Sequence, residues 1–560
     1  MPTNNNFKDY PTAARRRVLT TSGALAGLFA VAGAANAINF ETGVPELTAR
    51  LDTTLRYNLG FRADRIDPRI GNNPSFDESD YRFSKRGDIV TNRVDLLSEL
   101  EVDYKQAYGF RVSGTAWYDH AYRDSTVRQN PALANLPSSY FNNRYSRLTK
   151  RFYRGSGEFL DAFVYGNFTV AGEPLSVRVG KHSLYWGNSL FSGAGIAYSQ
   201  QPTDGRKAAA TPGVEARETF LPLNQVSATY QISDTVQVAG QYFFDWDHVR
   251  SPEGGTFLGS SDSSLLGPDR VGGASPFLRA DPLGPDKKRG NWGVNTKISP
   301  ISWNGTSLGI YYREFDEKNG LWLLRNPADP TTYRPVFARG TKLIGLGLDA
   351  TLGAVSVGGE LSLRKGAGLN TFSFTPTNEG ARGNVYHASI NATSALPNSP
   401  LWDFGSVSAE LTYDYLDKVT KNPDLFNSVD AVTAAGVKRC PLGVAAGCAT
   451  KDAWGMTVRV GPSWSQVYPG VDLSVPLVFA AGLKGNTADF GGTNEGARSY
   501  SIGAEFDIRK KWLVTLTYAD TRGKLVQNGT NALGPTYTGN GSGALTSDRG
   551  RVTLTVKTSF

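Results

Sequence analysis

Alternation between apolar and polar residues is the dominant pattern along this chain of 560 residues. In the stretch 47–61, apolar and aromatic residues hold most odd positions, and polar or charged residues hold most even ones. The same period returns in 93–104, 355–364 and 406–415, where the polar positions carry both signs of charge. A two-residue period predicts β-strands. Because a soluble sandwich would not bury both charge signs on its inner face, the pattern favours a membrane barrel with an apolar outside and a polar lumen.

The spacing of the pattern predicts eighteen strands, and sixteen stays open because strand boundaries read from sequence are uncertain. The segments between the strands alternate strictly between long and short. Long outer loops and short periplasmic turns are typical of bacterial outer-membrane barrels, and an even strand count returns both chain ends to the periplasm. We therefore expect an all-β, transmembrane antiparallel barrel. Its long loops are predicted at 63–87, 121–157, 183–224, 247–289, 316–339, 366–382, 417–451, 482–498 and 522–548.

The two ends of the chain predict export to the outer membrane. Arg15, Arg16 and Arg17 precede an apolar stretch that ends in Ala35-Asn36-Ala37, so we expect 1–37 to be a signal peptide and 38–560 the barrel. A short membrane anchor and a twin-arginine signal are the alternatives. The last ten residues alternate and end on Phe560. They look like the closing strand of an outer-membrane barrel, whose final aromatic is the usual insertion signal for the barrel-assembly machinery.

Composition sharpens this interpretation by exclusion. The chain has Gly 62, Tyr 25, Phe 28 and Trp 10, which fits a β-rich protein with aromatic surfaces. With Cys 2 and His 4 it has little material for a metalloenzyme. A net charge of +8 is too small to indicate a nucleic-acid partner. Beyond the leader no apolar run approaches the roughly 18 residues of a transmembrane helix.

Only residues 38–46 precede the first expected strand, which argues against a transporter with an N-terminal plug. A constriction must then come from the outer loops 121–157, 183–224 and 247–289. The middle loop carries aromatic residues away from the strand ends and would form an apolar constriction if it folds into the lumen. The candidate constriction residues are Trp186, Gly187, Phe191, Asp204, Glu215 and Phe220. The charged residues expected to line the lumen are Arg50, Arg56, Glu99, Glu101, Arg178 and Glu360.

Motifs for catalysis or metal binding are weak. Residues 305–309 match the G-x-S-x-G pattern, but they run directly into an expected strand, whereas that motif needs a strand-to-helix turn. His120, His182 and His248 fall at the outer ends of three strands roughly 10 Å apart, too far for a shared metal. We therefore expect no enzyme activity, no cofactor and no metal.

Two outer loops carry further patterns. Loop 121–157 is basic, and its cations could form a funnel for anionic solutes or neutralise lipopolysaccharide phosphates, which arginine binds well. These cations are Arg123, Arg128, Arg144, Arg147, Lys150, Arg151 and Arg154. In loop 417–451, Cys440 and Cys448 are the exported pair that would form a disulfide at the loop tip. A metal pair is the alternative there.

The segment 178–191 resembles the signature of an outer-membrane family catalogued as domain of unknown function 1302. The matching positions are Arg178, Gly180, Trp186, Gly187, Ser189 and Phe191. The segments 202–204, 212–220 and 246–256 follow in the order that the family has. Lys181-His182, Tyr185 and Asn188 depart from the signature, and Asn188 removes a carboxylate that the family has there.

The resemblance implies a barrel in the Gram-negative outer membrane, in contact with membrane lipid and lipopolysaccharide. Members are often encoded beside a LolB-like lipoprotein and RND-type exporters, in settings that handle sterols, terpenes or lipids. Our main hypothesis is a passive channel for small hydrophobic or amphipathic compounds. The alternative is an outer-membrane partner of a lipid-handling system that works with that lipoprotein and exporter. A surface hydrolase is a third and weaker hypothesis.

Overall fold

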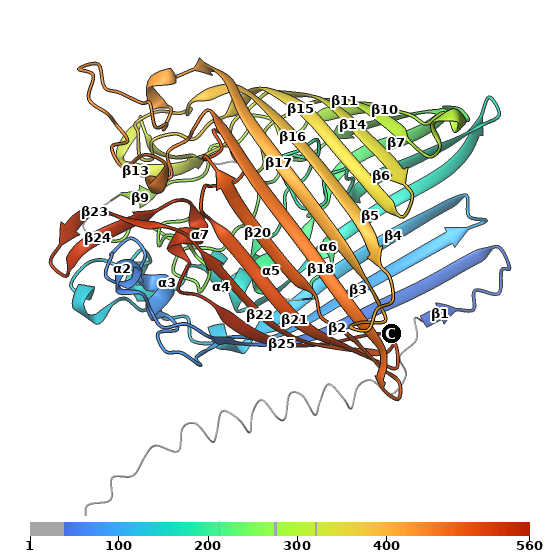
Figure 1. Cartoon of the computed structure of the whole chain (residues 1–560), viewed down its shortest axis with the longest axis horizontal. Helices are drawn as coiled ribbons and strands as arrows, with labels where there is room; N and C mark the ends of the chain where they lie inside the picture. The colour runs from blue at the N-terminus through green and yellow to red at the C-terminus, as the bar shows by residue number, and fades with distance from the viewer. Residues whose placement is uncertain (1–37, 212, 274–276, 320–321) are drawn as a thin grey trace, which may run out of the picture.

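A single closed sheet dominates the computed structural model, which describes residues 38–211, 213–273, 277–319 and 322–560 (Figure 1). The sheet contains 20 strands. Of these, β1 (Ile38–Phe40) is a short segment, and β19 (Val471–Ser474) and β20 (Leu477–Lys484) are two parts of one barrel strand. The break between them falls at Pro476, which has no backbone N–H to donate to a neighbouring strand. The closed antiparallel barrel therefore has 18 strands, which confirms the predicted fold.

The barrel strands follow one another around the wall in chain order. The first nine are β2 (Leu47–Arg62), β3 (Ile89–Tyr104), β4 (Tyr108–Asp119), β5 (Gly155–Val170), β6 (Glu173–His182), β7 (Leu223–Ser233), β8 (Val236–Phe243), β10 (Trp292–Ile298) and β11 (Ser307–Phe315). After them come β14 (Thr341–Leu352), β15 (Val355–Gly368), β16 (Arg382–Leu396), β17 (Phe404–Lys421), β18 (Asp452–Tyr468), the β19–β20 strand, β21 (Arg498–Ile508), β22 (Trp512–Arg522) and β25 (Arg551–Ser559).

Pairing between the first and the last barrel strand closes the sheet. β2 pairs with β25 from Thr54↔Ser559 to Arg62↔Arg551. Below this ladder, the backbone groups of Thr53 and Phe560 exchange hydrogen bonds of 2.6 and 2.8 Å. β1 then pairs with β2 at 49–51 and continues the edge that β25 leaves uncovered. Since an open strand edge is not tolerated in lipid, the segment after residue 37 and the C-terminal Phe560 complete the seam together.

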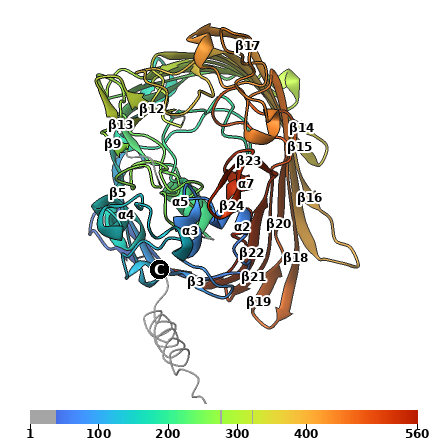
Figure 2. The ribbon, with the colours of Figure 1, turned by 90° about the vertical axis from the view of Figure 1, so that its left-hand side faces the viewer.

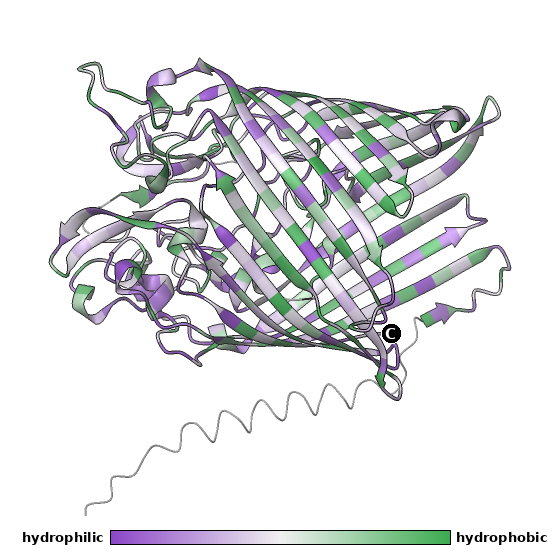
Figure 3. Ribbon diagram, viewed as in Figure 1, coloured by the Kyte–Doolittle hydropathy of each residue, from purple (hydrophilic) through white to green (hydrophobic). Residues whose placement is uncertain are grey.

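Side chains alternate between lipid and lumen along every strand, as Figure 3 shows by the alternation of colours. Outward positions hold exposed apolar side chains such as Phe159, Val164 and Ile390. Inward positions hold buried charged side chains such as Arg56, Arg93 and Asp95. In β5 an irregular register opposite Val112 and Gly114 shifts the alternation by one, which turns Phe159 outward.

The connections at one end of the barrel are short and those at the other end are long, as predicted. The three-residue turn after β3, residues 105–107, contains Lys105 and Gln106, both with positive φ (57° and 56°). β1 and the C-terminus lie at this end, opposite the long loops (Figure 1). The long loops are at 63–88, 120–154, 183–222, 244–291, 316–340, 369–381, 422–451, 485–497 and 523–550. No helix in the described ranges is long and apolar enough to cross a membrane.

The long loops pack on one another over the outer end of the barrel (Figure 2). A cluster of buried aromatic residues, with Phe83, Tyr122, Tyr140 and Phe257 at its centre, joins three of these loops. The loop helices are α2 (Pro68–Gly71), α3 (Asp77–Tyr81), α4 (Arg147–Tyr153), α5 (Gly205–Ala210), α6 (Ala216–Thr219) and α7 (Ser542–Leu545). The short helices are η1 (His120–Tyr122), η2 (Pro131–Leu133), η3 (Phe141–Asn143), η5 (Pro423–Leu425) and η6 (Gly443–Ala446), with η4 (Ile301–Trp303) in a turn. The loop strands are β9 (Leu278–Arg279), β12 (Trp322–Asn326), β13 (Asp329–Val336), β23 (Leu525–Asn531) and β24 (Gly534–Gly539).

Candidate functional site: a loop folded into the lumen

The loop between β6 and β7, residues 183–222, turns into the barrel and is called the lumen loop below. It carries α5 and α6. One part of it contacts inward side chains of β15, β16 and β17, and another part contacts inward side chains of β25, β2, β3 and β5. The lumen loop therefore crosses the lumen and is attached to two separate parts of the wall.

Two carboxylates of the wall hold the first part of the lumen loop by its backbone. Glu360 on β15 accepts hydrogen bonds from the backbone N–H groups of Asn188, of Ser189 at 2.9 Å and of Ile196 at 2.8 Å. Glu410 on β17 accepts them from Leu190 and Ser192, both at 2.6 Å, and from Phe191 at 3.2 Å. Hydrogen bonds to an ionised acceptor are about twice as strong as neutral ones, so this contact positions the loop firmly.

Glycine makes this close approach possible. Gly187 has φ +101°, and a Cβ atom there would lie 2.3 Å from an oxygen of Glu360. A Cβ atom at Gly195 would lie 2.1 Å from the other oxygen. A residue with a side chain at either position would push the loop away from the carboxylate.

Ion pairs attach the second part of the lumen loop to the opposite wall. Arg56 on β2 makes two hydrogen bonds to Glu218 in α6, at 2.8 and 3.0 Å, and both side chains are buried. Arg217 pairs with Glu99 on β3, and Glu215 pairs with Lys557 on β25 at 2.8 Å. Removing one partner of a buried ion pair typically costs about 3–5 kcal/mol. These ion pairs therefore stabilise one position of α6 against the wall.

α5 is attached in the same way, nearer the outer end. The buried carboxylate of Asp204 caps α5 by accepting from the backbone N–H groups of Arg206 and Lys207, and it pairs with the Arg206 side chain at 2.5 Å. Lys207 in turn pairs with Glu158 on β5 at 3.2 Å. The Arg206 guanidinium lies 3.6 Å from the centre of the Phe152 ring of α4. The lumen loop is thereby connected to the outer loop that carries α4.

Apolar contacts also fix the lumen loop, at both its ends and beside Glu360. Trp186 is buried, with its ring 6.3 Å from that of Tyr311 on β11. Ile196 is fully buried against Gly345 on β14, where a Cβ atom would lie 2.8 Å from the isoleucine. The rings of Tyr185 and Phe220 lie 5.6 Å apart. These contacts make the loop a packed element of the barrel interior.

Three apolar or aromatic side chains of the lumen loop stay exposed inside the barrel. The exposed fractions are 43% for Tyr185, 47% for Leu190 and 39% for Phe191. Leu190 and Phe191 belong to the segment whose backbone Glu410 holds. We call these three residues the loop tip. They place apolar surface at exposed positions of the lumen loop.

The lumen wall consequently has two different regions. Under the lumen loop, β11 and β15–β17 carry a group of inward residues that are polar or charged and buried; we call this region the covered wall. It includes Arg313, Glu360, Ser362, Arg364, Ser389 and Glu410. The inward face of β21 carries Glu505 and Asp507 near the short turns. Farther out, the inward residues at 478–480, 499–501 and 517–519 of β20, β21 and β22 are small, uncharged and in contact with solvent; we call this region the open wall. It includes Val478, Ala480, Ser499, Ser501, Thr517 and Ala519.

Three of the six predicted lumen-lining residues contact the lumen loop, and the other three contact neighbouring residues of the wall. Arg56, Glu99 and Glu360 hold the lumen loop. Arg50 is exposed nearer the periplasmic end, where it pairs with Asp52 at 2.8 Å. Glu101 lies opposite Arg111 in the same half of the wall. Arg178 lies 5.8 Å from the centre of the Phe163 ring. All six are on inward positions of their strands.

Several site residues have no distinctive sequence pattern. The alternation of 406–415 places Glu410 in the lumen, but nothing local indicates that it holds a loop whose residues lie 218 to 220 positions away. Glu218 and Leu190 are equally unremarkable in the sequence. The two glycines that approach Glu360 belong to a glycine-containing loop, and this is the single feature that hints at a close backbone contact.

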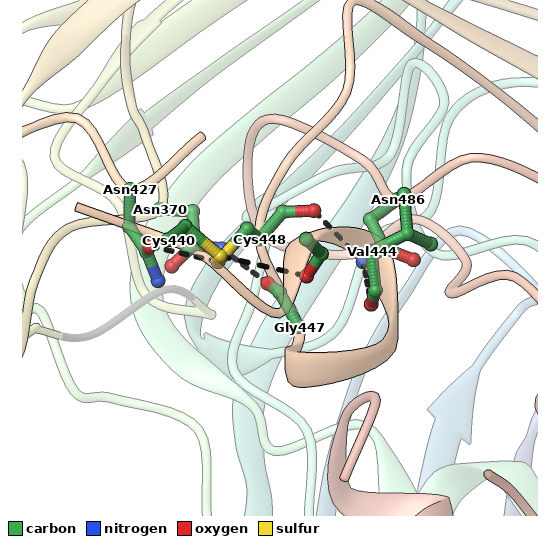
Figure 4. The surroundings of a disulfide bond; sticks show 8 residues. Asn370, Asn427, Cys440, Val444, Gly447, Cys448 and Asn486 are labelled. Carbon is green, nitrogen blue, oxygen red and sulfur yellow. Dashed lines mark hydrogen bonds between the residues drawn. A yellow bond between two sulfur atoms is a disulfide. The ribbon is translucent and has the colours of Figure 1, made fainter. Parts of the chain in front are cut away.

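Cys440 and Cys448 form a disulfide in loop 422–451 (Figure 4). The segment around the disulfide is attached to two neighbouring loops. Asn486 donates its side-chain N–H groups to the carbonyl oxygens of Val444 and Cys448, both at 2.9 Å. Asn370 donates to the carbonyl of Gly447 at 2.9 Å. The disulfide therefore stabilises a point where three outer loops meet.

The residues considered for catalysis or metal binding are dispersed. His182 is buried and hydrogen-bonded to Ser227 at 2.8 Å, whereas His248 stacks on Phe337 with ring centres 5.4 Å apart. Ser307 lies within β11 and donates to Asp349. Over the described residues, no group of three His, Cys, Asp or Glu side chains could hold a metal ion.

A second set of buried charges lies in the outer loops, above the barrel. Asp77, Glu78 and Asp80 of α3 meet Asp262 and Asp548 from two other loops; we call these five the carboxyl cluster. The cations facing it are Arg62 and Arg549, which pair with Asp80 at 3.0 and 3.1 Å, and Arg270. The carboxylates outnumber these cations, so part of the cluster must stay protonated in the packed loops.

Burial controls the protonation of the carboxyl cluster. Removal from water raises the pKa of Glu78 to about 8, although hydrogen bonds from Ser139 act in the opposite direction. The same cause raises the pKa of Asp77 to about 7 and that of Asp548 to about 7. These groups titrate near neutral pH, which links the packing of the outer loops to pH.

The closed 18-strand barrel, with a loop held across its lumen, defines a barrel of the outer-membrane porin type. The chain matches the family described as "Protein of unknown function (DUF1302)" over residues 18–560, and it belongs to this family. The expected signal peptide lies outside the described residues. No curated protein matches the chain.

Solved structures with a similar arrangement are outer-membrane barrels of two bacteria. The chain is similar to Acinetobacter baumannii OccAB2 with a TM-score of 0.42 and 10% identity, over 91% of this chain and 98% of that one. It is similar to Acinetobacter baumannii OccAB3 with a TM-score of 0.42 and 11% identity, over 91% and 99%. For Pseudomonas aeruginosa OccK1 (OpdK) the values are 0.38 and 11%, over 91% and 98%. These identities are too low to transfer a ligand or a role to this chain.

Proposed function

We propose that the protein is a channel for the passive passage of small hydrophobic or amphipathic compounds through the outer membrane. The single observation that carries this proposal is the contrast between the two walls of the lumen. Charged groups concentrate where the lumen loop is held, whereas the open wall and the loop tip border the remaining space with small or apolar side chains.

The chemistry of this path suits a solute with an apolar part. A molecule that moves along the open wall meets Val478, Ala480 and Ser501 on one side. The exposed Leu190 and Phe191 offer apolar contact for the parts of the solute that water solvates poorly. The carboxylates of Glu360 and Glu410 are buried and hydrogen-bonded to the lumen loop, so a passing solute makes no direct contact with them.

The size of the barrel agrees with a water-filled path. Barrels of 16 to 18 strands normally enclose an aqueous channel unless something fills it. The lumen loop occupies part of this one, which narrows the channel without replacing the solvated open wall. A narrowed channel with weak contacts on both sides allows a solute to enter and also to leave.

Planar-bilayer recording of the refolded chain 38–560 tests the proposal. We expect stable unitary conductance steps, and we expect hexyl glucoside to block the current transiently whereas glucose, with the same head group, does not. In the double variant L190A/F191A the block by hexyl glucoside should weaken and the unitary conductance should rise.

Phe141 provides the matched control, because it is a similarly exposed aromatic residue on an outer loop outside the lumen loop. F141A should behave like the unchanged protein. A folded, heat-modifiable barrel that gives no conductance steps would contradict a channel. Equal block by hexyl glucoside and by glucose would contradict the apolar path.

A further inference from the structure

A group of cations stands on the outer rim of the barrel, above the ends of β4 and β5. Arg147, Lys150 and Arg151 lie in α4, and Arg154 precedes β5. Together with Tyr118, Gly155 and Ser156 they line an open cavity of about 510 Å³. We call these four cations the rim patch. In Figure 2, α4 lies beside β5 at the border of the ring of strands.

The rim patch has no counter-charge in the described part of the chain. None of its members lies within 4.0 Å of a carboxylate, unlike Arg206 or Arg250 nearby, which pair with Asp204 and Glu158. Arg147, Arg151 and Arg154 are exposed, so their charges are available to a partner. Like charges at this spacing repel each other, and a bound anion would relieve that repulsion.

Directly below the rim patch, the wall turns apolar side chains toward the membrane. Tyr118 on β4 is 45% exposed, and Phe159 on β5 is 72% exposed. Val112 and Val164 continue this surface along the same two strands. An aromatic residue below a group of cations is the arrangement found at a membrane interface, where the ring lies at head-group level.

A second basic cavity adjoins the first on the neighbouring strands. It has a volume of about 330 Å³, and its charged lining residues are Arg82, Arg123 and Arg128 with Asp88 and Asp124. Asp124 compensates part of the charge by pairing with Arg82 and with Arg128, both at 3.7 Å. The two cavities lie on either side of the top of β4, so the rim offers two basic positions over one apolar surface.

We propose that the rim patch binds the phosphate groups of lipid A, the membrane-embedded part of lipopolysaccharide. Arg147, Lys150, Arg151 and Arg154 bind one phosphate by charge-assisted hydrogen bonds, for which arginine has a suitable geometry. The acyl chains of the lipid lie against Phe159 and Val164. The cavity with Arg123 and Arg128 takes the second phosphate of the same head group.

Geometry favours this lipid over a soluble anion on its way to the channel. The residues that line the rim cavity include the inward Trp117 and the outward Tyr118, which faces the membrane, but none of the loop tip. A phosphate that is bound by the rim patch stands at the upper edge of the wall, beside this outward surface. A soluble anion would gain only the charge contact, whereas a lipid also covers the exposed apolar side chains below it.

Lipid retention measured by native mass spectrometry tests the proposal on the detergent-solubilised barrel. The test variant is R147Q/K150Q/R151Q. The control variant is K287Q/K288Q/R289Q. It removes three exposed cations of another outer loop, which are not part of the rim patch. Each barrel is titrated with bis-phosphorylated lipid A, with dephosphorylated lipid A and with phosphatidylglycerol.

We expect the unchanged barrel to retain bis-phosphorylated lipid A, and the test variant to bind it at least tenfold more weakly. The control variant should stay within twofold. Dephosphorylated lipid A should bind the unchanged barrel more weakly than the bis-phosphorylated form does. Equal retention by test and control variants would overturn the proposal, and so would stronger retention of phosphatidylglycerol than of lipid A. Heat-modifiability on a gel verifies that each variant is folded.

A second variant separates the lipid from a free anion. F159S removes the apolar contact and keeps every cation of the rim patch. We expect F159S to weaken lipid A binding severalfold. Inorganic phosphate should displace lipid A poorly from F159S, as it does from the unchanged barrel. If inorganic phosphate displaces lipid A at millimolar concentration from the unchanged barrel, the site binds phosphate alone and the proposal fails.

Discussion

The covered wall and the open wall are built from the same alternating strands, yet they differ in every property that matters for transport. Inward positions of the covered wall carry Arg313, Glu360, Arg364 and Glu410, and each is buried under loops. Inward positions of the open wall carry alanine, serine, threonine and valine, and most keep solvent contact. The comparison shows that Arg313, Glu360 and Glu410 of the covered wall hold the lumen loop, and the proposed path of a solute follows the uncharged open wall.

The energetic reason for the difference is the cost of burying an unpaired charge. Glu360 and Glu410 can be buried because several backbone N–H groups replace the water that they lose. A charge on the open wall would have no such partner. It would remain solvated and would reduce the apolar contact available to a solute.

The largest effect is expected from breaking the buried pair between Arg56 and Glu218. E218Q leaves Arg56 buried beside Asp95 but without its main partner. Loss of the pair costs about 3–5 kcal/mol. We therefore expect α6 to detach from β2 and to leave the lumen beside β2 open. Single-channel recording should show a higher conductance with frequent fluctuations. R50Q, which alters an exposed pair on the same strand, should leave the conductance unchanged.

A charge placed on the open wall should have the next largest effect. A480K puts a cation on an inward position that neither a carboxylate nor a loop covers. Because the lysine projects into the path, we expect lower conductance, a shift of selectivity toward anions and loss of the block by hexyl glucoside. S362K is the converse experiment on the covered wall. S362K should disturb folding, since Ser362 is buried. Equal shifts of the reversal potential in A480K and S362K would contradict the difference between the open wall and the covered wall.

Raising the pH should loosen the outer loops but not the barrel. Burial raises the pKa of Asp77 and of Asp548 to about 7 and that of Glu78 to about 8, above the usual value near 4. The stabilisation by the carboxyl cluster is therefore complete below about pH 4 and disappears as the pH rises through 8. We expect protease to cut the outer loops faster at pH 9 than at pH 6, while the barrel stays heat-modifiable. E78Q should reduce this difference, and an unchanged pH dependence in E78Q would place its origin elsewhere.

The smallest effect is expected from the glycine beside Glu360. G195A adds a methyl group where a Cβ atom would lie 2.1 Å from the carboxylate, so the backbone must shift. We expect the loop to stay in the lumen, held by Glu410 and by the ion pairs of α6, with a modest change in conductance noise. G193A is the matched control, because a Cβ atom at Gly193 meets no atom within 4 Å. Equal noise in both variants would mean that the close approach to Glu360 contributes little.

The parts of this barrel that follow from local periodicity could be predicted from the sequence. The strands that begin at Leu47, Val355 and Phe404 alternate clearly, and the chain closes through the C-terminal strand that ends near Phe560. The alternation also places Glu360 and Arg56 in the lumen. A strand interrupted at Pro476 and the shifted register of β5 depend on single residues, and the pattern does not specify them.

The candidate site depends on contacts between distant residues, which periodicity does not record. The sequence indicates that 183–224 is long and aromatic, but the partners of its backbone are strands more than 160 residues away. Trp186 was expected to narrow the lumen, and the structure places it in a packed position against β11, while Leu190 joins Phe191 at the exposed tip. The meeting of three loops at the carboxyl cluster is likewise a property of the folded chain.

The most direct test of the two-wall account uses the reactivity of single cysteines in the lumen. Both native cysteines are in the disulfide Cys440–Cys448, so a new cysteine reacts alone. S501C places a thiol on the open wall, and S362C places one on the covered wall. The account predicts that a charged methanethiosulfonate reagent rapidly reduces the current through S501C and leaves S362C unchanged. Equal reaction at both positions, or reaction at S362C alone, would contradict it.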